Sequence, residues 1–126
     1  MALLEEGALG NPHWEDQPDA MKLIVDWLEQ PLDEAVNQIA GLGLVPGQTC
    51  DWDRISPFVV PSVIWSLYSF LRTPDDYWRA VGTAIRVGGD VDTTAAMTGA
   101  ISGAHLGLEA LPTHLSTRVH DRGTWD

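Results

Sequence analysis

Two carboxylates and a hydroxyl lie within four positions of one another in the segment 88–94, which reads Gly-Gly-Asp-Val-Asp-Thr-Thr. Asp90, Asp92 and Thr93 offer hard oxygen donors, and neither a histidine nor a thiol stands among them. Donors of this kind suit Mg²⁺ or Mn²⁺ better than zinc. The pattern therefore predicts a metal site whose ligands are Asp90, Asp92 and Thr93.

The two glycines ahead of these acids predict the shape of the loop that carries them. A helical pattern runs up to Val87, and glycine just past a helix supports the left-handed conformation that ends it, so we expect Gly88 and Gly89 to turn the chain. The next helix begins at Thr93 or Thr94, and one polar residue could simply cap it. A cap needs only one such residue, whereas clustered carboxylates repel unless a cation or several donors hold them ionised. We therefore favour metal binding over capping alone.

A phosphatase is an alternative interpretation of the same segment. Asp90, Asp92 and Thr94 satisfy the Asp-x-Asp-x-Thr pattern of haloacid-dehalogenase-type phosphatases. In that class the first Asp ends a buried parallel strand, which should read as a continuous apolar run. Residues 78–87 instead place apolar side chains at 78, 81 and 85, which is helical spacing. The phosphatase is therefore the weaker alternative.

Histidines add little to this site. His105 lies twelve residues beyond Thr93, which is about 18 Å along a helix axis, so it cannot share the metal. His13, His114 and His120 are isolated in the sequence. We expect none of them to act as a ligand.

The six tryptophans divide by their surroundings. Three fall in helical patterns and are expected in the core, and three fall in loops, where they could stack on a nucleotide base. The helical ones are Trp27, Trp65 and Trp78, and the loop ones are Trp14, Trp52 and Trp125.

Composition restricts the classes of partner. The 126 residues suffice for one domain with a modest core. The formal net charge is -11, with seven Lys and Arg together, which argues against nucleic acid and against anionic membranes. The single cysteine, Cys50, excludes an internal disulfide, fits a reducing compartment and has no evident activating partner. No signal-peptide pattern follows Met1, so we expect a cytoplasmic protein.

Apolar spacing and turn formers predict six helices and no strand. We expect helices from Pro18 to Pro31, from Leu32 to Gly41, from Pro61 to Arg72, from the Thr73-Pro74 start to Gly88, from Thr93 or Thr94 to about Leu108, and from Pro112. Residues 1–17 should be irregular, residues 44–57 a loop, and residues 121–126 a mobile tail. The inward residues of the first three helices should be Met21, Ile24, Val25 and Leu28, then Leu32, Ala35, Val36 and Ile39, then Val63, Ile64, Leu67, Phe70 and Leu71.

The fifth expected helix carries glycines spaced by four, at Gly99, Gly103 and Gly107. Such a strip lets another backbone approach closely, but Thr and Ser residues make the segment too polar to span a bilayer. We therefore predict the central helix of an all-α helical bundle.

The segment from Thr73 to Pro112, with the Gly-Gly-Asp-x-Asp-Thr element and the small-residue helix after it, resembles the C-terminal part of the ADP-ribosylglycohydrolase family. That family includes ADP-ribosyl-acceptor hydrolases and the dinitrogenase reductase-activating glycohydrolase, and the similarity extends more loosely back to about Pro18. The resemblance implies an all-α fold that holds two Mg²⁺ or Mn²⁺ ions. These ions orient ADP-ribose while water displaces a group from its anomeric carbon. By position, Asp90, Asp92 and Thr93 would be metal ligands, and Val91 stands where Thr is common.

Two motifs of the family have no counterpart in this sequence. An N-terminal Gly-Asp-Ala-Leu-Gly motif and a Thr-Asp-Asp motif supply the remaining ligands and acidic groups, and segment 7–10 matches the first by letters only. We therefore expect residues 18–126 to be the C-terminal part of such a domain and to be inactive alone. The expected partners are ADP-ribose or an ADP-ribosylated substrate, and the missing N-terminal half. Self-association is an expected consequence of an incomplete core. A non-catalytic, crystallin-like protein of the same fold is the alternative.

Overall fold

The structure is a computed structural model that describes residues 20–44, 47, 51–120 and 122. Within these ranges the chain is helical and contains no strand, which confirms the expected all-α fold. The elements are α3 (Ala20–Glu29), α4 (Leu32–Ala40), α5 (Val59–Arg72), α6 (Tyr77–Arg86), α7 (Val91–Leu106), the short 3-10 helix η1 (Leu108–Ala110) and α8 (Thr113–Ser116).

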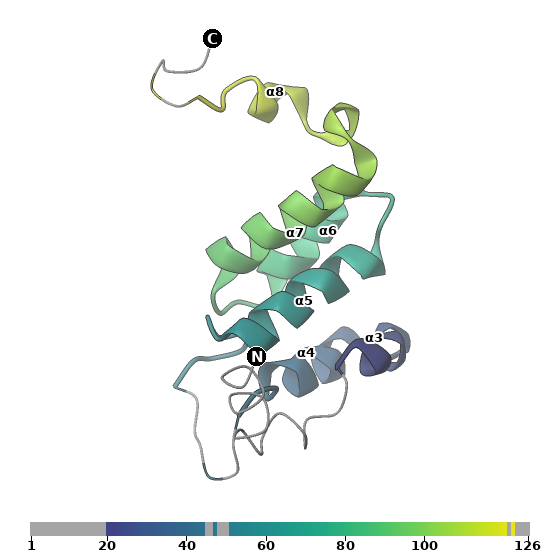
Figure 1. The fold of residues 1–126 in the computed structure, drawn as a ribbon, viewed down its shortest axis with the longest axis vertical. Helices are drawn as coiled ribbons and strands as arrows, with labels where there is room; N and C mark the ends of the chain where they lie inside the picture. Colours follow the sequence, from purple (N-terminus) through teal and green to yellow (C-terminus); the bar gives the residue numbers. More distant parts are fainter. Residues whose placement is uncertain (1–19, 45–46, 48–50, 121, 123–126) are drawn as a thin grey trace, which may run out of the picture.

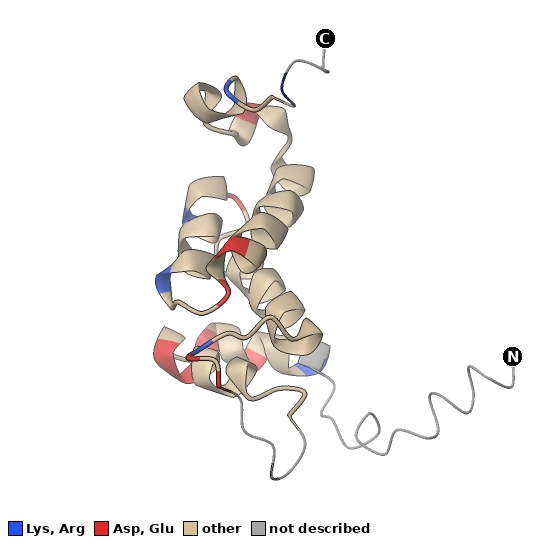
Figure 2. Cartoon of the chain, turned by 90° about the vertical axis from the view of Figure 1, so that its left-hand side faces the viewer, with Lys and Arg blue, Asp and Glu red and all other residues tan. Residues whose placement is uncertain are grey.

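Helix α5 is the centre of the arrangement, because α3, α4, α6 and α7 all pack against it. Figure 1 shows α3 and α4 at one end, α5 above them, and α6 and α7 side by side beyond it, after which the chain leads through η1 to α8. The acidic residues coloured in Figure 2 are concentrated at the α3 and α4 end. Among the described residues no helix is long and apolar enough to cross a membrane.

The apolar core lies between α5 and the first two helices. The Trp65 and Tyr68 rings stack with centroids 5.0 Å apart, and the Trp27 indole is also buried. The expected core positions of Trp27 and Trp65 are therefore confirmed, and the core expectation for Trp78 is wrong, since that side chain is 62% exposed. The buried cluster consists of Ile24, Trp27, Ala35, Val36, Ile39, Ile55, Ile64, Trp65 and Tyr68.

The opposite face of α5 packs on α7 through small polar residues. Ser66 Oγ donates to the carbonyl oxygen of Thr94, and Thr98 Oγ1 donates to the carbonyl oxygen of Ser66. Small hydroxyl side chains allow the two helices to lie close together, and these two hydrogen bonds satisfy buried polar atoms, whereas the buried Ser69 and Ser102 hydroxyls have no partner among the described residues. The prediction that Val63 faces inward is wrong, because serines take the buried face and leave Val63 42% exposed. The buried serines and threonines of α5 and α7 are Ser62, Ser66, Ser69, Thr94, Thr98 and Ser102.

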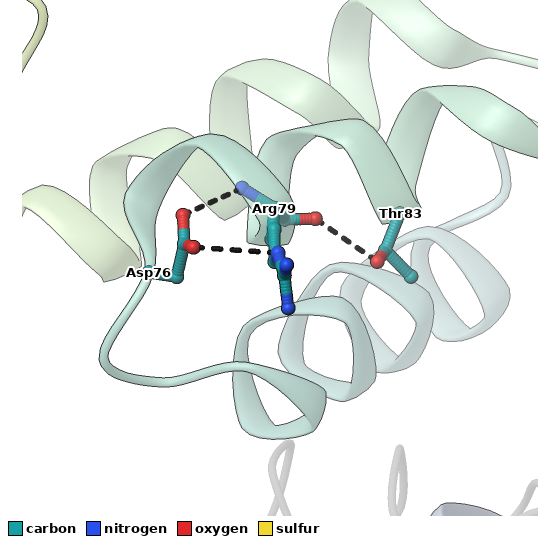
Figure 3. Close-up of polar contacts among 3 residues, drawn as sticks. All are labelled: Asp76, Arg79 and Thr83. Atoms are coloured by element: carbon teal, nitrogen blue, oxygen red, sulfur yellow. Dashed lines mark hydrogen bonds and ion pairs between the residues drawn. The ribbon is translucent and has the colours of Figure 1, made fainter.

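Helix α6 begins three residues later than expected. Thr73 ends α5 instead of capping α6, and Asp76 is the N-cap, whose Oδ1 accepts the backbone N–H of Arg79 at 3.0 Å (Figure 3). A turn separates the two helices, in which the Asp76 N–H donates to the Thr73 carbonyl oxygen at 3.2 Å. The Thr73 N–H donates to the Phe70 carbonyl oxygen and closes α5, so the chain passes through the turn before Asp76 caps the next helix.

The remaining boundaries lie close to those expected. Helix α5 starts at Val59 instead of Pro61, and α7 starts at Val91 and ends at Leu106, where Gly107 has a φ of +83°. Val25 in α3 is 58% exposed, contrary to expectation. The expectations for residues 1–17, for Cys50 and for the tail apart from residue 122 concern residues outside the described ranges.

Gly99 and Gly103 of α7 pack against the side chain of a neighbouring helix and not against its backbone. A Cβ at Gly99 would lie 3.0 Å from the Tyr77 hydroxyl, and one at Gly103 would lie 4.0 Å from the same ring. Tyr77 is the first residue of α6, so the strip seats the start of that helix. The prediction that α7 is the central helix is therefore wrong, because α5 holds that place.

Candidate metal centre

The loop between α6 and α7 is built on two glycines in the left-handed region. Helix α6 is closed by Val87, after which Gly88 has a φ of +81° and Gly89 a φ of +87°. Side chains other than hydrogen are disfavoured at such angles, so the glycine pair permits the turn. The turn places Asp90 immediately before the first residue of α7.

A distant segment holds this loop from the other side. Gly89 forms an isolated parallel bridge with Ile55, and the Asp90 N–H donates to the Ile55 carbonyl oxygen at 2.8 Å. A Cβ at Gly89 would lie 2.7 Å from the Ile55 backbone nitrogen, which only glycine avoids. Sequence reasoning missed this contact, although a lone buried isoleucine among the turn formers of 51–57 is a signal that the loop is anchored.

Asp90 occupies the N-cap position of α7 without using its carboxylate as a cap. Its main-chain carbonyl oxygen accepts both the N–H and the hydroxyl of Thr94, each at 3.1 Å. A hydrogen bond with the Asp90 side chain lowers the pKa of Asp92, and the backbone N–H groups of Thr93 and Asp92 lower it further. The two carboxyl groups are therefore neighbours, and a cation between them would offset the repulsion of their charges.

The first turn of α7 separates outward from inward side chains. Asp92 and Thr93 are exposed and Asp90 is partly buried, so their oxygens are accessible to an ion from solvent. Thr94 is 1% exposed and lies within the interface with α5. Its burial distinguishes the two threonines, because only the Thr93 hydroxyl lies on the accessible side.

The donor set fits a hard divalent cation. Two neighbouring carboxylates and a hydroxyl provide oxygen ligands only, which Mg²⁺ and Mn²⁺ prefer. Within the described parts of the chain no group of three or more His, Cys, Asp or Glu side chains gathers at one place. The loop can therefore supply part of a coordination sphere, and water or other ligands must complete it.

The structure also bears on the other chemical candidates. Helix α6 and not a strand leads into Asp90, which removes the phosphatase interpretation. His105 contacts the Phe70 ring edge-on at 5.4 Å, so it packs near the far end of α7. His114 and His120 are exposed, and Trp52 is 47% exposed in the segment that Ile55 anchors.

Comparison with known proteins places these features in a family context. A family model described as ADP-ribosylglycohydrolase matches residues 1–126. Among curated proteins, the chain is similar to the ADP-ribosylhydrolase ARH3 of Danio rerio, with 47% identity over 45 residues. That segment covers 36% of this chain and 12% of the relative. No solved structure matches the chain.

Proposed function

Because the chain belongs to the ADP-ribosylglycohydrolase family, we propose that it contributes the cation-binding loop of a metal-dependent hydrolase that cleaves a glycosidic bond to ADP-ribose. The observation that carries this proposal is the pair of neighbouring carboxylates, Asp90 and Asp92, on a glycine loop fixed by Ile55. The ADP-ribosylhydrolase name of the relative supports the choice of substrate class.

Asp90, Asp92 and Thr93 would hold Mg²⁺ or Mn²⁺, as one part of a dinuclear centre. A bound ion supplies positive charge that orients the anionic substrate and polarises a water molecule. The protein's own contribution is rigidity, since the Ile55 carbonyl and the start of α7 fix the main chain of Asp90 from both sides. The Asp90 side chain and the neighbouring backbone N–H groups lower the pKa of Asp92, so a proton competes with a cation there less than at an ordinary aspartate.

Beyond the two carboxylates that would hold the metal, the loop has no acidic group that could act as acid or base. Glycosidic cleavage uses a carboxyl group to activate water or assist the leaving group, and a carboxylate committed to a metal serves poorly in that role. The described residues offer no third acidic ligand or base beside Asp90 and Asp92. We therefore propose that the 126-residue chain alone does not turn over substrate, and that the family's N-terminal motifs must be supplied.

Trp52 is the candidate for contact with the adenine base. Its indole is 47% exposed and lies three residues before Ile55, whose backbone touches the metal loop. An aromatic ring in that position can stack on a base, which contributes about 1–3 kcal/mol.

A non-catalytic role on the same fold is the second candidate. The incomplete donor set of the loop favours it, because binding without turnover needs no acid or base. The two candidates differ in what the missing motifs do when they are added back.

The test is calorimetry with ADP-ribose in Mg²⁺ and in EDTA, followed by a hydrolysis assay with an N-terminal half from a relative supplied in trans. The proposal predicts affinity that rises with Mg²⁺, no turnover by the chain alone, and turnover on complementation. Asp90→Asn should abolish the Mg²⁺-dependent gain in affinity, and Asp33→Asn, an exposed acid in the first turn of α4, should not. Turnover by the chain alone, or an equal Mg²⁺ effect in both variants, would contradict the proposal.

A further inference from the structure

A second polar feature lies on one face of α6 and at the end of α5, and none of the metal-loop residues 88–93 lines it. A groove of about 470 Å³ runs there and is lined in part by Arg72, Arg79 and Arg86. The whole chain carries seven Lys and Arg against eighteen Asp and Glu. Three cations around one groove are therefore a local reversal of the overall charge, which attracts an anion.

Each guanidinium is presented differently. Arg72 donates from Nη1 to the hydroxyl of the fully buried Tyr68 at 2.8 Å, which fixes its direction. Arg79 lies 3.5 Å from the Asp76 carboxylate through Nε, and its side chain is 77% exposed (Figure 3). The Arg86 side chain makes no hydrogen bond or ion pair with any other described residue. With one carboxylate against three cations, the groove keeps a surplus of positive charge.

An aromatic ring and an open surface accompany these cations. Trp78 also lines the groove and is 62% exposed, unusual for so large an apolar side chain. Gly82 lies in the middle of α6, where glycine costs about 1 kcal/mol relative to alanine, and a Cβ there would meet nothing within 4 Å. Packing therefore does not explain Gly82, which leaves the groove open beside the indole.

The rim of the groove also holds an unsatisfied polar atom. The Thr73 hydroxyl oxygen is buried and has no hydrogen-bond partner in the described part of the chain. Buried hydroxyls normally have a partner, but this oxygen is covered by the protein itself, so it is not counted among the groups that face the groove.

We propose that this groove binds a nucleoside diphosphate, with the arginines holding the phosphates and the Trp78 ring stacking on the base. Guanidinium groups match phosphate oxygens in geometry and charge, and aromatic rings stack on any base. The groove volume falls within the range of small-molecule sites, which favours a nucleotide over an extended acidic peptide. This site is separate from the proposed metal centre and requires no metal.

The experiment is calorimetric titration of the 126-residue chain with ADP, adenosine and inorganic pyrophosphate, in low salt with EDTA. Arg86→Gln should weaken ADP binding about tenfold or more, as expected for loss of a charge-assisted hydrogen bond. Trp78→Ala should weaken ADP about tenfold and leave pyrophosphate unchanged, because stacking contributes only with a base. The matched control Arg118→Gln removes the same charge from an exposed position outside the groove and should bind ADP like the parent chain.

Several outcomes would overturn the proposal. They are no ADP binding by the parent chain, equal losses in Arg86→Gln and Arg118→Gln, adenosine binding as tightly as ADP, or poly-glutamate displacing ADP at equal charge concentration. Circular dichroism on each variant checks folding, and Arg79→Gln replaces Arg86→Gln if the latter misfolds. The doubly substituted chain with Asp90→Asn and Asp92→Asn should keep its ADP affinity in EDTA. Loss of binding in that chain would show that ADP binds at the loop and not in the groove. If the metal proposal fails, the expected result of this titration stays the same, because it is carried out in EDTA.

Discussion

The main chain of Ile55 lies against Gly89 and forms a parallel bridge with it, so two segments thirty-four residues apart meet at the start of α7. The space at this contact excludes a Cβ on Gly89, which would lie 2.9 Å from the Ile55 carbonyl carbon. The loop that carries Asp90 and Asp92 is therefore positioned by tertiary packing as well as by its own glycines.

This contact predicts that the two glycines differ in their tolerance of alanine. Gly88→Ala should lower the free energy of unfolding by about 1–2 kcal/mol, since its φ of +81° disfavours a side chain but nothing lies within 4 Å. Gly89→Ala adds a collision with the Ile55 backbone and should cost about 3 kcal/mol or more. Urea unfolding of both variants measures the difference, and equal losses would show that the bridge does not form.

The interface between α5 and α7 predicts the effect of removing one hydroxyl. Thr98→Val keeps the shape of the side chain but loses the hydrogen bond to the Ser66 carbonyl oxygen, which should cost about 1 kcal/mol. Thermal unfolding provides the measurement. Thr93→Val on the exposed side of α7 is the control and should stay within about 0.5 kcal/mol of the parent.

Ser102→Ala should have a different effect on stability at the same interface. The Ser102 hydroxyl is buried without a partner among the described residues, so its removal should leave stability unchanged or raise it slightly. If Thr98→Val and Ser102→Ala destabilised the chain equally, the hydrogen bonds assigned across this interface would be wrong.

The outer side of α7 predicts self-association. Ala96, Ala100 and Ala104 are spaced by four and are exposed, so they share one small apolar face. Uncovered faces of this kind promote contact between molecules. Light scattering should detect a dimer or larger species, and Ala100→Glu should shift it toward monomer, whereas Ala110→Glu on η1 should not. A compact parent monomer that melts cooperatively would contradict this expectation.

Local signals in the sequence predict which segments form helices and where the glycine turn lies. Prolines and glycines mark the ends of α4 and α7, and the left-handed angles of Gly88 and Gly89 follow from their place after a helix. The start of α6 was misplaced because Thr73 and Asp76 are both good caps, and only the turn between them decides which one is used.

Contacts between distant segments were not readable from the sequence. The bridge from Ile55 to Gly89 depends on the path of the loop over 51–57, which has no periodic pattern. Val63 is expected on the buried face of α5 because valine is more hydrophobic than serine, but serines occupy that face. Trp78 was assigned to the core for the same reason, and its exposure became evident only from the packing of α6.

Titration of the chain with Mn²⁺, followed by electron paramagnetic resonance of the free ion, measures whether the loop between α6 and α7 binds a cation. We expect weak binding, since two carboxylates and a hydroxyl leave most positions to water. Asp90→Asn and Asp92→Asn should each lower the affinity by about tenfold or more, whereas Asp33→Asn, with the same charge change in the first turn of α4, should not. Equal Mn²⁺ affinity in all three variants would show that the loop holds no metal and would contradict the account.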